Sequence, residues 1–207
     1  MIVAGLLLAA GSGSRMGSPK ALVLGVNGRP WVVDAARVLI AGGCNRVYVT
    51  VGAQGRAVRQ ALRAESVSVI DVDDWSEGLS TSLRRGLEVI SEHAADAVLV
   101  HLVDLPDIGS DVVERMCGDE ATLARATYDG APGHPVLIGR EHWRALLSSL
   151  SGDSGANAYL KSQGVKSIEC SDLASGKDID ARSATRSAQE PFRISAKDRP
   201  TRGVVEE

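Results

Sequence analysis

A glycine-rich stretch near the start of the chain combines residue types that hold a polyphosphate. It runs from Leu8 to Leu22 and contains three glycines together with Arg15 and Lys20. Glycine lets successive backbone N–H groups turn toward one anion, and the two cations add fixed positive charge. An ordinary Gly/Ser turn after a buried strand is the alternative. We predict nucleotide binding by Leu8, Ala9, Ala10, Gly11, Ser12, Gly13, Arg15 and Lys20.

The glycine spacing matches neither of two common phosphate-binding motifs. The P-loop has Gly-Lys-Ser/Thr, whereas Ser18 and Pro19 separate Gly17 from Lys20. The dinucleotide-binding fingerprint has two residues between its second and third glycines, and this chain has three, at 14–16. Pro19 also argues against a helix that continues through the loop.

Three aspartates farther along the chain are candidates for holding a divalent cation. Asp104 follows the apolar stretch 95–103, and Asp178 and Asp180 lie on one side of an extended segment. Mg²⁺ prefers carboxylate and phosphate oxygens, so we predict a magnesium site of Asp104 with Asp178 or Asp180. A turn or cap role for Asp104, and a solvated acidic pair at 178–180, are the alternatives. Arg15, Lys20 and Asp104 are the candidate catalytic residues, because fixed charge stabilises a breaking phosphoryl bond.

Two other regions supply candidates for binding. A helix predicted from Ser80, which is its expected cap, would present its N-terminus and hydroxyls to the nucleotide through Gly78, Ser80 and Ser82. An acceptor molecule is expected to meet His134, Pro135, Ser154 and Asn157. A turn histidine and a capped helix start are the structural alternatives for these positions. His101, inside an apolar stretch, is predicted to be a core histidine with its hydrogen bonds satisfied.

Strand-like and helix-like stretches alternate along the chain. Apolar stretches expected to be strands are 2–8, 46–51, 67–72, 95–103 and 165–170. Helical spacing covers 30–41, 54–64, 80–92, 110–117, 141–150 and 157–163, and a hairpin is expected at 121–138 with Asp129-Gly130 at its turn. We therefore predict an α/β fold: a single-domain, Rossmann-like three-layer sandwich, its mainly parallel sheet covered by helices on both faces, with a small β-hairpin insertion. Ligands of such sheets bind beyond the carboxyl ends of the strands.

Composition limits the classes of partner. The chain has 207 residues and a net charge of −3, which argues against nucleic acid. Its three cysteines, far apart in sequence, are expected to be reduced thiols in a cytoplasmic protein. Neither a signal peptide nor a membrane-spanning stretch is expected. We expect one domain over 1–181 and a polar C-terminal tail over 182–207.

Six motifs, in order, resemble the molybdenum cofactor nucleotidyltransferases. They are LAAGSGSRMGSPKAL (8–22), DWSEGLSTSLRRGL (74–87), LVDLP (102–106), GHPVLIGR (133–140), GDSGANAYL (152–160) and DID (178–180). The Leu-Ala-Ala-Gly opening and the Trp-x-x-Gly-x-x-x-Ser stretch are similar to the cytidylyltransferase branch. The resemblance implies Mg²⁺-dependent transfer of CMP from CTP to the phosphate of molybdenum cofactor (molybdopterin), with release of pyrophosphate. A client molybdoenzyme is a possible partner.

The chain also departs from this family. Val103 stands where the family commonly has glycine, Pro19 stands where it often has asparagine, and 181–184 replaces its usual Thr-Pro-Glu-Asp. These departures concern the second metal carboxylate and the acceptor. Alternatives are therefore a GTP-dependent guanylyltransferase for the same cofactor, a sugar-phosphate nucleotidyltransferase, and a non-enzymatic carrier or chaperone of the cofactor.

Overall fold

The computed structural model describes residues 1–13, 19–152 and 155–178. These residues form a seven-stranded sheet with the strand order β3-β2-β1-β4-β6-β5-β7. The strands are β1 (Val3–Leu8), β2 (Arg46–Val51), β3 (Val67–Asp71), β4 (Ala97–Leu102), β5 (Leu123–Tyr128), β6 (Ala131–Gly139) and β7 (Lys166–Glu169).

The direction of β6 decides which of its residues lie at the edge of the sheet where β1, β2 and β4 end. Among the described strands, β6 alone runs opposite to its neighbours β4 and β5. Leu8 at the end of β1 lies beside Thr50 of β2 and Leu102 of β4, so these three strands end at a common edge. Because β6 is reversed, it begins at that edge, where Val136 pairs with Val100.

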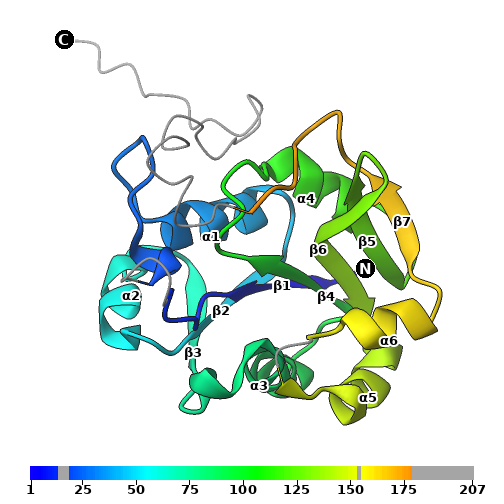
Figure 1. Cartoon of the computed structure of the whole chain (residues 1–207), viewed down its shortest axis with the longest axis horizontal. Helices are drawn as coiled ribbons and strands as arrows, with labels where there is room; N and C mark the ends of the chain where they lie inside the picture. Colours follow the sequence, from blue (N-terminus) through cyan, green and yellow to red (C-terminus); the bar gives the residue numbers. More distant parts are fainter. Residues whose placement is uncertain (14–18, 153–154, 179–207) are drawn as a thin grey trace.

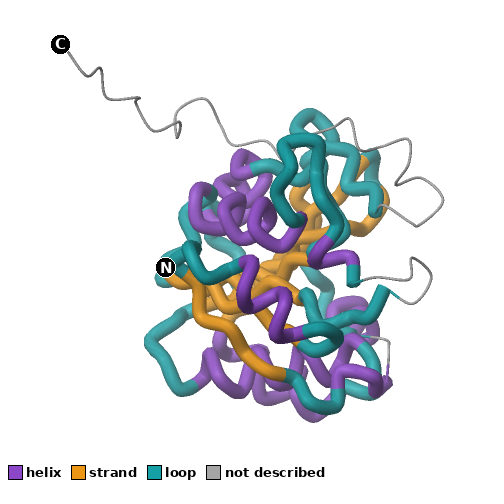
Figure 2. The backbone as a smooth tube through the Cα atoms, turned by 90° about the vertical axis from the view of Figure 1, so that its left-hand side faces the viewer, coloured by secondary structure: helices purple, strands orange, loops and turns teal. Residues whose placement is uncertain are grey.

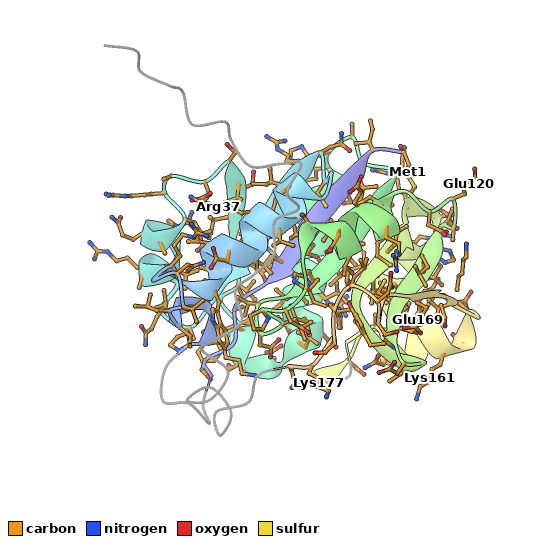
Figure 3. All side chains as sticks on the ribbon, turned by 90° about the horizontal axis from the view of Figure 1, so that it is seen from above. Met1, Arg37, Glu120, Lys161, Glu169 and Lys177 are labelled. Atoms are coloured by element: carbon orange, nitrogen blue, oxygen red, sulfur yellow. The ribbon has the colours of Figure 1, made fainter. Side chains whose placement is uncertain are left out.

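Helices cover both faces of the sheet (Figures 1 and 2). One face carries α1 (Trp31–Ala41), α2 (Gly55–Ala61) and α4 (Ser110–Cys117). The other carries α3 (Leu79–Ser91), α5 (Arg140–Ser149) and α6 (Asn157–Ser162). Figure 3 shows the molecule from above, with α1 and α4 in front of the sheet. This arrangement confirms the predicted three-layer α/β sandwich.

Two apolar cores separate the layers, and β1 contributes to both. All six residues of β1 are buried, with Leu7 facing one core and Leu6 the other. Helix α3 lies very close to this strand, since a Cβ added at Gly86 would come within 2.7 Å of a Leu6 methyl carbon. The close approach fixes α3, and therefore its N-terminus, beside the end of β1.

The elements agree with the sequence prediction apart from a few residues at their ends. Helix α3 begins at Leu79, and its N-cap is Gly78 with φ 116°. The prediction that Ser80 caps this helix is therefore wrong, because a glycine-only backbone conformation starts the helix earlier. The predicted hairpin has its turn at Asp129 and Gly130, both with positive φ, and its strands join the main sheet. The predicted tail over 182–207 lies outside the described residues.

The structure also gives new information on the buried residue His101 and on two of the cysteines. His101 belongs to the core as predicted, but neither ring nitrogen has a hydrogen-bond partner among the described residues. The prediction of a satisfied histidine is therefore wrong. Cys44 and Cys117, distant in sequence, have thiols that interact with each other, which raises the pKa of Cys44 and lowers that of Cys117. Within the described part of the chain, no helix has the length and apolarity needed to cross a bilayer.

Candidate active site

A cleft of about 390 Å³ opens where β1 ends and α3 begins, and we call it the loop cleft. It contains six of the residues predicted to bind nucleotide. Three other residues, absent from the prediction, also line it. The lining is Leu8, Ala10, Gly11, Ser12, Gly78 and Ser82, with Trp75, Ser76 and Leu79 as the additions.

Backbone hydrogen bonds hold the first wall of the loop cleft. The N–H of Ala9 donates to the carbonyl of Thr50 at 3.2 Å, and the N–H of Ala53 donates to the carbonyl of Ala10 at 3.0 Å. The loop after β1 is thereby tied to the end of β2. A Cβ added at Gly11 would meet no atom within 4 Å, so this glycine faces open space. A ligand can therefore come close to the backbone at Gly11.

The second wall is the start of α3 and the turn before it. Gly78 has φ 116° and ψ −176°, which turns the chain from the short helix η2 (Trp75–Glu77) into α3. Trp75 packs directly on the backbone of Gly52, where an added Cβ would lie 2.5 Å from the Trp75 Cβ. The first N–H groups of α3 and its dipole favour an anion in this cleft.

Lys20 and Asp104 meet near this edge, although 84 positions separate them in sequence. Lys20 begins the short helix η1 (Lys20–Leu22), and Asp104 follows β4. The Lys20 Nζ donates to Asp104 Oδ2 at 2.8 Å, and both side chains are about one-fifth exposed, at 22% and 19%. The sheet thus brings two of the three predicted catalytic residues into contact, while Arg15 lies outside the described residues.

The described side chains supply only some of the ligands that a divalent cation such as Mg²⁺ needs. Asp104 supplies one partly exposed carboxylate, and phosphate oxygens and water are the ligands that Mg²⁺ normally adds to such a group. Asp178 is exposed, and Asp180 lies outside the described residues. In the described ranges, no group of three or more His, Cys, Asp or Glu side chains is placed to hold a metal. A metal here would therefore depend on the substrate for part of its coordination.

A second, narrow cavity of about 30 Å³ lies on the α3 side of the sheet, and we call it the apolar pocket. Its described polar lining consists of Arg125, His134 and Asn157. The other lining residues are apolar or glycine: Leu8, Leu79, Leu83, Val100, Val136, Ile138, Gly155, Ala156 and Leu160. Leu8 and Leu79 line both cavities, so the apolar pocket and the loop cleft share a wall.

His134 enters the apolar pocket from the beginning of β6. Its Nδ1 lies 3.4 Å from the carbonyl of Val100, and its own carbonyl accepts a hydrogen bond from the Tyr128 hydroxyl at 2.7 Å. Burial lowers the pKa of His134 to about 4, with the positive charge of Arg125 acting in the same direction and the negative charge of Asp104 opposing it. The imidazole is therefore neutral at pH 7, so one ring nitrogen donates and the other accepts.

Several predicted site residues do not line either cavity. Ser80 is buried and its hydroxyl donates to the carbonyl of Ser151 at 3.1 Å. Ala9 and Pro135 are buried beside the cavities, Gly13 has φ 58° at the end of the first described range, and Ser154 lies outside the described residues. Asn157 does line the apolar pocket, where its Oδ1 accepts a hydrogen bond from Arg125.

Arg125 is the main residue that the sequence analysis missed. The sequence offered no distinct signal, since a partly exposed arginine between two buried alanines fits the ordinary alternation of side chains along a strand. Trp75 and Leu79 were within the motif 74–87 but were not singled out.

Comparison with known families gives a match over most of the chain. Residues 5–167 match the family described as MobA-like NTP transferase domain. The chain is 36% identical over 190 residues to nicotine blue oxidoreductase of Paenarthrobacter nicotinovorans, covering 86% of this chain and 92% of that relative. It is 32% identical over 149 residues to molybdenum cofactor guanylyltransferase of Rhodobacter capsulatus, covering 71% of this chain and 68% of that relative.

Solved structures show the same fold. The structure of Rv0371c from Mycobacterium tuberculosis H37Rv superposes with a TM-score of 0.77 at 25% identity, covering 90% of this chain and 96% of that chain. A complex of that protein with manganese superposes with a TM-score of 0.68 at 24% identity, covering 82% of this chain and 88% of that chain.

Proposed function

Because the chain belongs to the MobA-like NTP transferase domain family, and is thus an enzyme of the nucleotidyltransferase type, we propose that it transfers CMP from CTP to the phosphate of molybdenum cofactor. Pyrophosphate is the second product. The observation that supports this proposal is the loop cleft of about 390 Å³ between the backbone at Gly11 and the start of α3, which suits phosphates. Leu8 and Leu79 also line the narrow apolar pocket, so an acceptor bound beside these two residues would be a neighbour of a nucleotide in the cleft.

The chemistry needs no nucleophile from the protein. An oxygen of the acceptor phosphate, ionised at neutral pH, attacks the α-phosphorus of the nucleotide. A bond forms between this oxygen and phosphorus as the bond to the bridging oxygen breaks, and pyrophosphate leaves with that electron pair. The protein contributes by holding the two phosphates in line and by neutralising charge.

We assign the described residues to these tasks as follows. Backbone N–H groups around Gly11 and the start of α3 hold the triphosphate, and Lys20, with Arg15, neutralises the leaving pyrophosphate. Lys20 already holds Asp104 at 2.8 Å, so the phosphates of an incoming nucleotide would compete with that carboxylate for the ammonium group. His134, Asn157 and the neighbouring Pro135 belong to the acceptor side.

Nucleotidyltransferases commonly use a divalent metal. We propose that Asp104 holds Mg²⁺ together with the phosphates, and that Asp178 or Asp180 completes the site. The metal would supply charge neutralisation at the reacting phosphates. Partial exposure of the Asp104 carboxylate supports this role, because a metal and water can reach it.

The nucleotide is tested by a pyrophosphate-release assay with each of four NTPs, Mg²⁺ and purified molybdenum cofactor. We expect release with CTP that depends on the cofactor. Release with GTP alone would replace our proposal by guanylyl transfer, the activity in the name of the Rhodobacter capsulatus relative. Cofactor binding without pyrophosphate release from any NTP would favour a carrier.

A second candidate is an oxidoreductase acting on a heteroaromatic compound. The relative named nicotine blue oxidoreductase favours it, since its similarity extends over most of both chains. Spectrophotometric reduction of nicotine blue with NADPH or NADH, in the absence of any NTP, would support this activity. A pyrophosphate signal without dye reduction would exclude it for this substrate.

A further inference from the structure

The segment that follows β7 runs back toward the loop that carries Asp104, and we call its residues 171–178 the strap (Figure 1, orange). The core holds the first part of the strap. The N–H groups of Leu173 and Ala174 donate to the carbonyl of the fully buried Cys170 at 2.9 and 3.0 Å. Leu173 and Ala174 also pack against the core that lies between the sheet and α1, α2 and α4. The path of the strap is therefore fixed as far as Ala174.

Asp107 holds the next residue of the strap. Its Oδ2 accepts hydrogen bonds from the N–H of Ser175, at 2.8 Å, and from the Ser175 hydroxyl, at 2.5 Å, and we call these two bonds the clasp. The N–H of Lys177 donates to the Ser175 hydroxyl oxygen at 3.4 Å, so the clasp also orders the residues just before Asp178. One carboxylate oxygen thus fixes a serine that lies 68 positions away in the sequence.

Tyr128 supports the strap directly after the clasp. Gly176 has φ 64°, and a Cβ added there would overlap the Tyr128 ring, so only glycine fits at this position. The Tyr128 hydroxyl donates to the carbonyl of His134 at 2.7 Å, which holds the ring in place. The backbone of the strap therefore rests on a fixed aromatic ring of β5.

Asp107 belongs to the same loop as Asp104. Leu105 and Ile108 of this loop are buried, at 4% and 0% exposed, and the N–H of Ile108 donates to the carbonyl of Leu105 at 3.3 Å. The two aspartates, by contrast, are both partly exposed. A buried turn thus anchors the loop and keeps Asp104 and Asp107 in a fixed relation to each other.

The two described candidates for metal binding lie equally far along the chain from the clasp. Asp104 comes three residues before Asp107. Asp178 comes three residues after Ser175. Because three residues span at most about 11 Å, the clasp limits how far Asp178 can move from the loop that supplies Asp104.

We propose that Asp107 is a positioning residue, which clasps the strap and thereby holds Asp178 at the same edge of the sheet as Asp104, where a divalent cation on the substrate phosphates would meet both carboxylates. This inference rests on the proposed function, because the cation is the one that Asp104 is proposed to hold. Asp107 itself is engaged elsewhere: Oδ2 accepts from Ser175, and Oδ1 is buried without a hydrogen-bond partner among the described residues. Burial of Oδ1 lowers the stability of the fold, so stability alone does not account for this carboxylate.

The first test measures hydrogen exchange in the ligand-free protein, by mass spectrometry of peptides that cover the strap. Asp107→Ala removes the acceptor of both clasp bonds, so we expect the amides of 175–178 to exchange about tenfold faster than in the wild type. The melting temperature should change little, because the unpartnered Oδ1 is removed together with the two bonds. Unchanged exchange in the strap would overturn the proposal.

Ser175→Ala is a second variant for the same measurement. Ser175 is exposed, so the change does not disturb the core. It removes the hydroxyl bond to Asp107 and keeps the N–H bond, and we expect exchange in the strap to rise about threefold. Exchange equal to that of the wild type would show that the hydroxyl contributes nothing to the clasp and would count against the proposal.

The second test measures Mn²⁺ binding by electron paramagnetic resonance, in the presence of whichever of the four NTPs raises the melting temperature most. Mn²⁺ prefers the same oxygen ligands as Mg²⁺. We expect Asp107→Ala to weaken Mn²⁺ binding about tenfold, as is usual for groups that support metal ligands. Asp107→Asn should stay within about threefold of the wild type, because its amide oxygen still accepts from Ser175. Equal losses in the two variants would show that the charge of Asp107 acts directly, and would overturn a positioning role.

Asp178→Asn identifies the residue through which Asp107 acts. This change alone should weaken Mn²⁺ binding about tenfold. Adding Asp107→Ala to it should then cause no further loss, because both changes remove the same contribution. An Asp178→Asn variant with wild-type affinity, or losses that add in the double variant, would overturn the proposal.

Asp119→Ala is the matched control. Asp119 also accepts from a backbone N–H and from a side chain, those of Ala121 and Lys166 at 2.8 Å, but neither partner belongs to the strap. We expect wild-type exchange in the strap and wild-type Mn²⁺ binding. Faster exchange of the strap in this variant as well would indicate a general loosening of the fold and would overturn the proposal.

These experiments separate the clasp from the proposed function, because none of them requires turnover. If no NTP yields pyrophosphate while the exchange and Mn²⁺ results are as expected, the transferase activity is rejected and the clasp is kept. If pyrophosphate is released by the wild type, and Asp107→Ala matches it in rate, strap exchange and Mn²⁺ affinity, the clasp is rejected and the activity is kept.

Discussion

The loop cleft is lined by loops and the start of a helix, whereas the apolar pocket is lined by side chains that also build the core. Gly11 and Ser76 in the cleft are exposed, and an atom added at Gly11 meets nothing. Leu83, Val136 and Ile138 in the pocket are almost fully buried. Substitutions in the cleft should therefore affect ligands more than stability, and substitutions in the pocket should affect both.

The largest effect is expected for Asp104→Asn. The change keeps the shape of the side chain but removes the charge that pairs with Lys20 and is proposed to hold Mg²⁺. We expect kcat for pyrophosphate release to fall about a thousandfold, equivalent to about 4 kcal/mol of lost transition-state stabilisation. The melting temperature should change little, since the ion pair is partly exposed.

Asp119→Asn provides the matched control for this prediction. Asp119 also accepts a hydrogen bond from a lysine, Lys166, at 2.8 Å, but it lies outside both cavities. Wild-type turnover is expected for this variant. Full activity of Asp104→Asn with Mg²⁺ would show that the metal and catalytic assignments are wrong.

The next effect concerns the wall of the apolar pocket. Leu83→Ala removes a side chain that is 2% exposed and belongs to the core between the sheet and α3. We expect a loss of about 2–5 kcal/mol in the free energy of unfolding, measured in urea, because a buried cavity is created. The melting-point rise produced by NTP and Mg²⁺ should remain.

Leu87→Ala distinguishes the pocket from the core in general. Leu87 is fully buried in the same core but does not line the pocket. Both variants should lose similar stability, while only Leu83→Ala should change the KM for the acceptor. An identical KM for the acceptor in the two variants would mean that Leu83 does not form part of a ligand site.

The third prediction concerns His101, which is buried in β4, and its effect on the stability of the fold at acidic pH. Burial lowers the pKa of His101 to about 3, with the charge of His134 acting in the same direction. The unfolded chain binds this proton near pH 6.5, so between these values the unfolded state holds more protons and acidification destabilises the fold. His101 alone should account for about 2 kcal/mol of lost stability between pH 7.5 and pH 5.

His101→Leu tests this contribution by urea denaturation at the two pH values. The variant should be as stable as the wild type or more stable at pH 7.5, because two unpartnered ring nitrogens are removed. It should also lose less stability than the wild type on going to pH 5. An unchanged pH dependence would place the acid sensitivity elsewhere, for example at His134, whose lowered pKa acts in the same direction.

The smallest effect on stability is expected at the loop cleft. Gly11→Ala adds a methyl group to open space at a backbone conformation that other residues adopt, so the free energy of unfolding should stay within about 0.5 kcal/mol of wild type. If phosphates approach this backbone, the same methyl group should weaken NTP binding about tenfold by calorimetry. Unchanged binding would move the phosphates away from Gly11.

Gly42→Ala should give the opposite result. An added Cβ there would clash with the Val113 side chain, where α1 meets α4, and Gly42 lines neither cavity. We expect a loss of about 1–3 kcal/mol in stability from overpacking and normal NTP affinity.

The contrast between the loop cleft and the apolar pocket also explains which features could be predicted from the sequence. The strand ends and the placing of Lys20 and Asp104 at one edge of the sheet follow from local patterns and from the rule that parallel strands end at one edge, whereas their ion pair was not predicted. Arg125 was missed because its role depends on β5, β6 and α6 coming together, which no local pattern encodes. The start of α3 was misplaced because the positive φ of Gly78 outweighed the capping preference of serine.

Leu8 and Leu79 line both cavities and so form a partition between the two proposed ligand sites. In kinetic terms, a partition of this kind suits a sequential mechanism, in which both substrates are bound before either product leaves. Double-reciprocal plots of initial rate against one substrate, at several fixed concentrations of the other, should then intersect. Trimming the partition with Leu79→Ala, at a residue that is 36% exposed, should alter the apparent affinities for both substrates together.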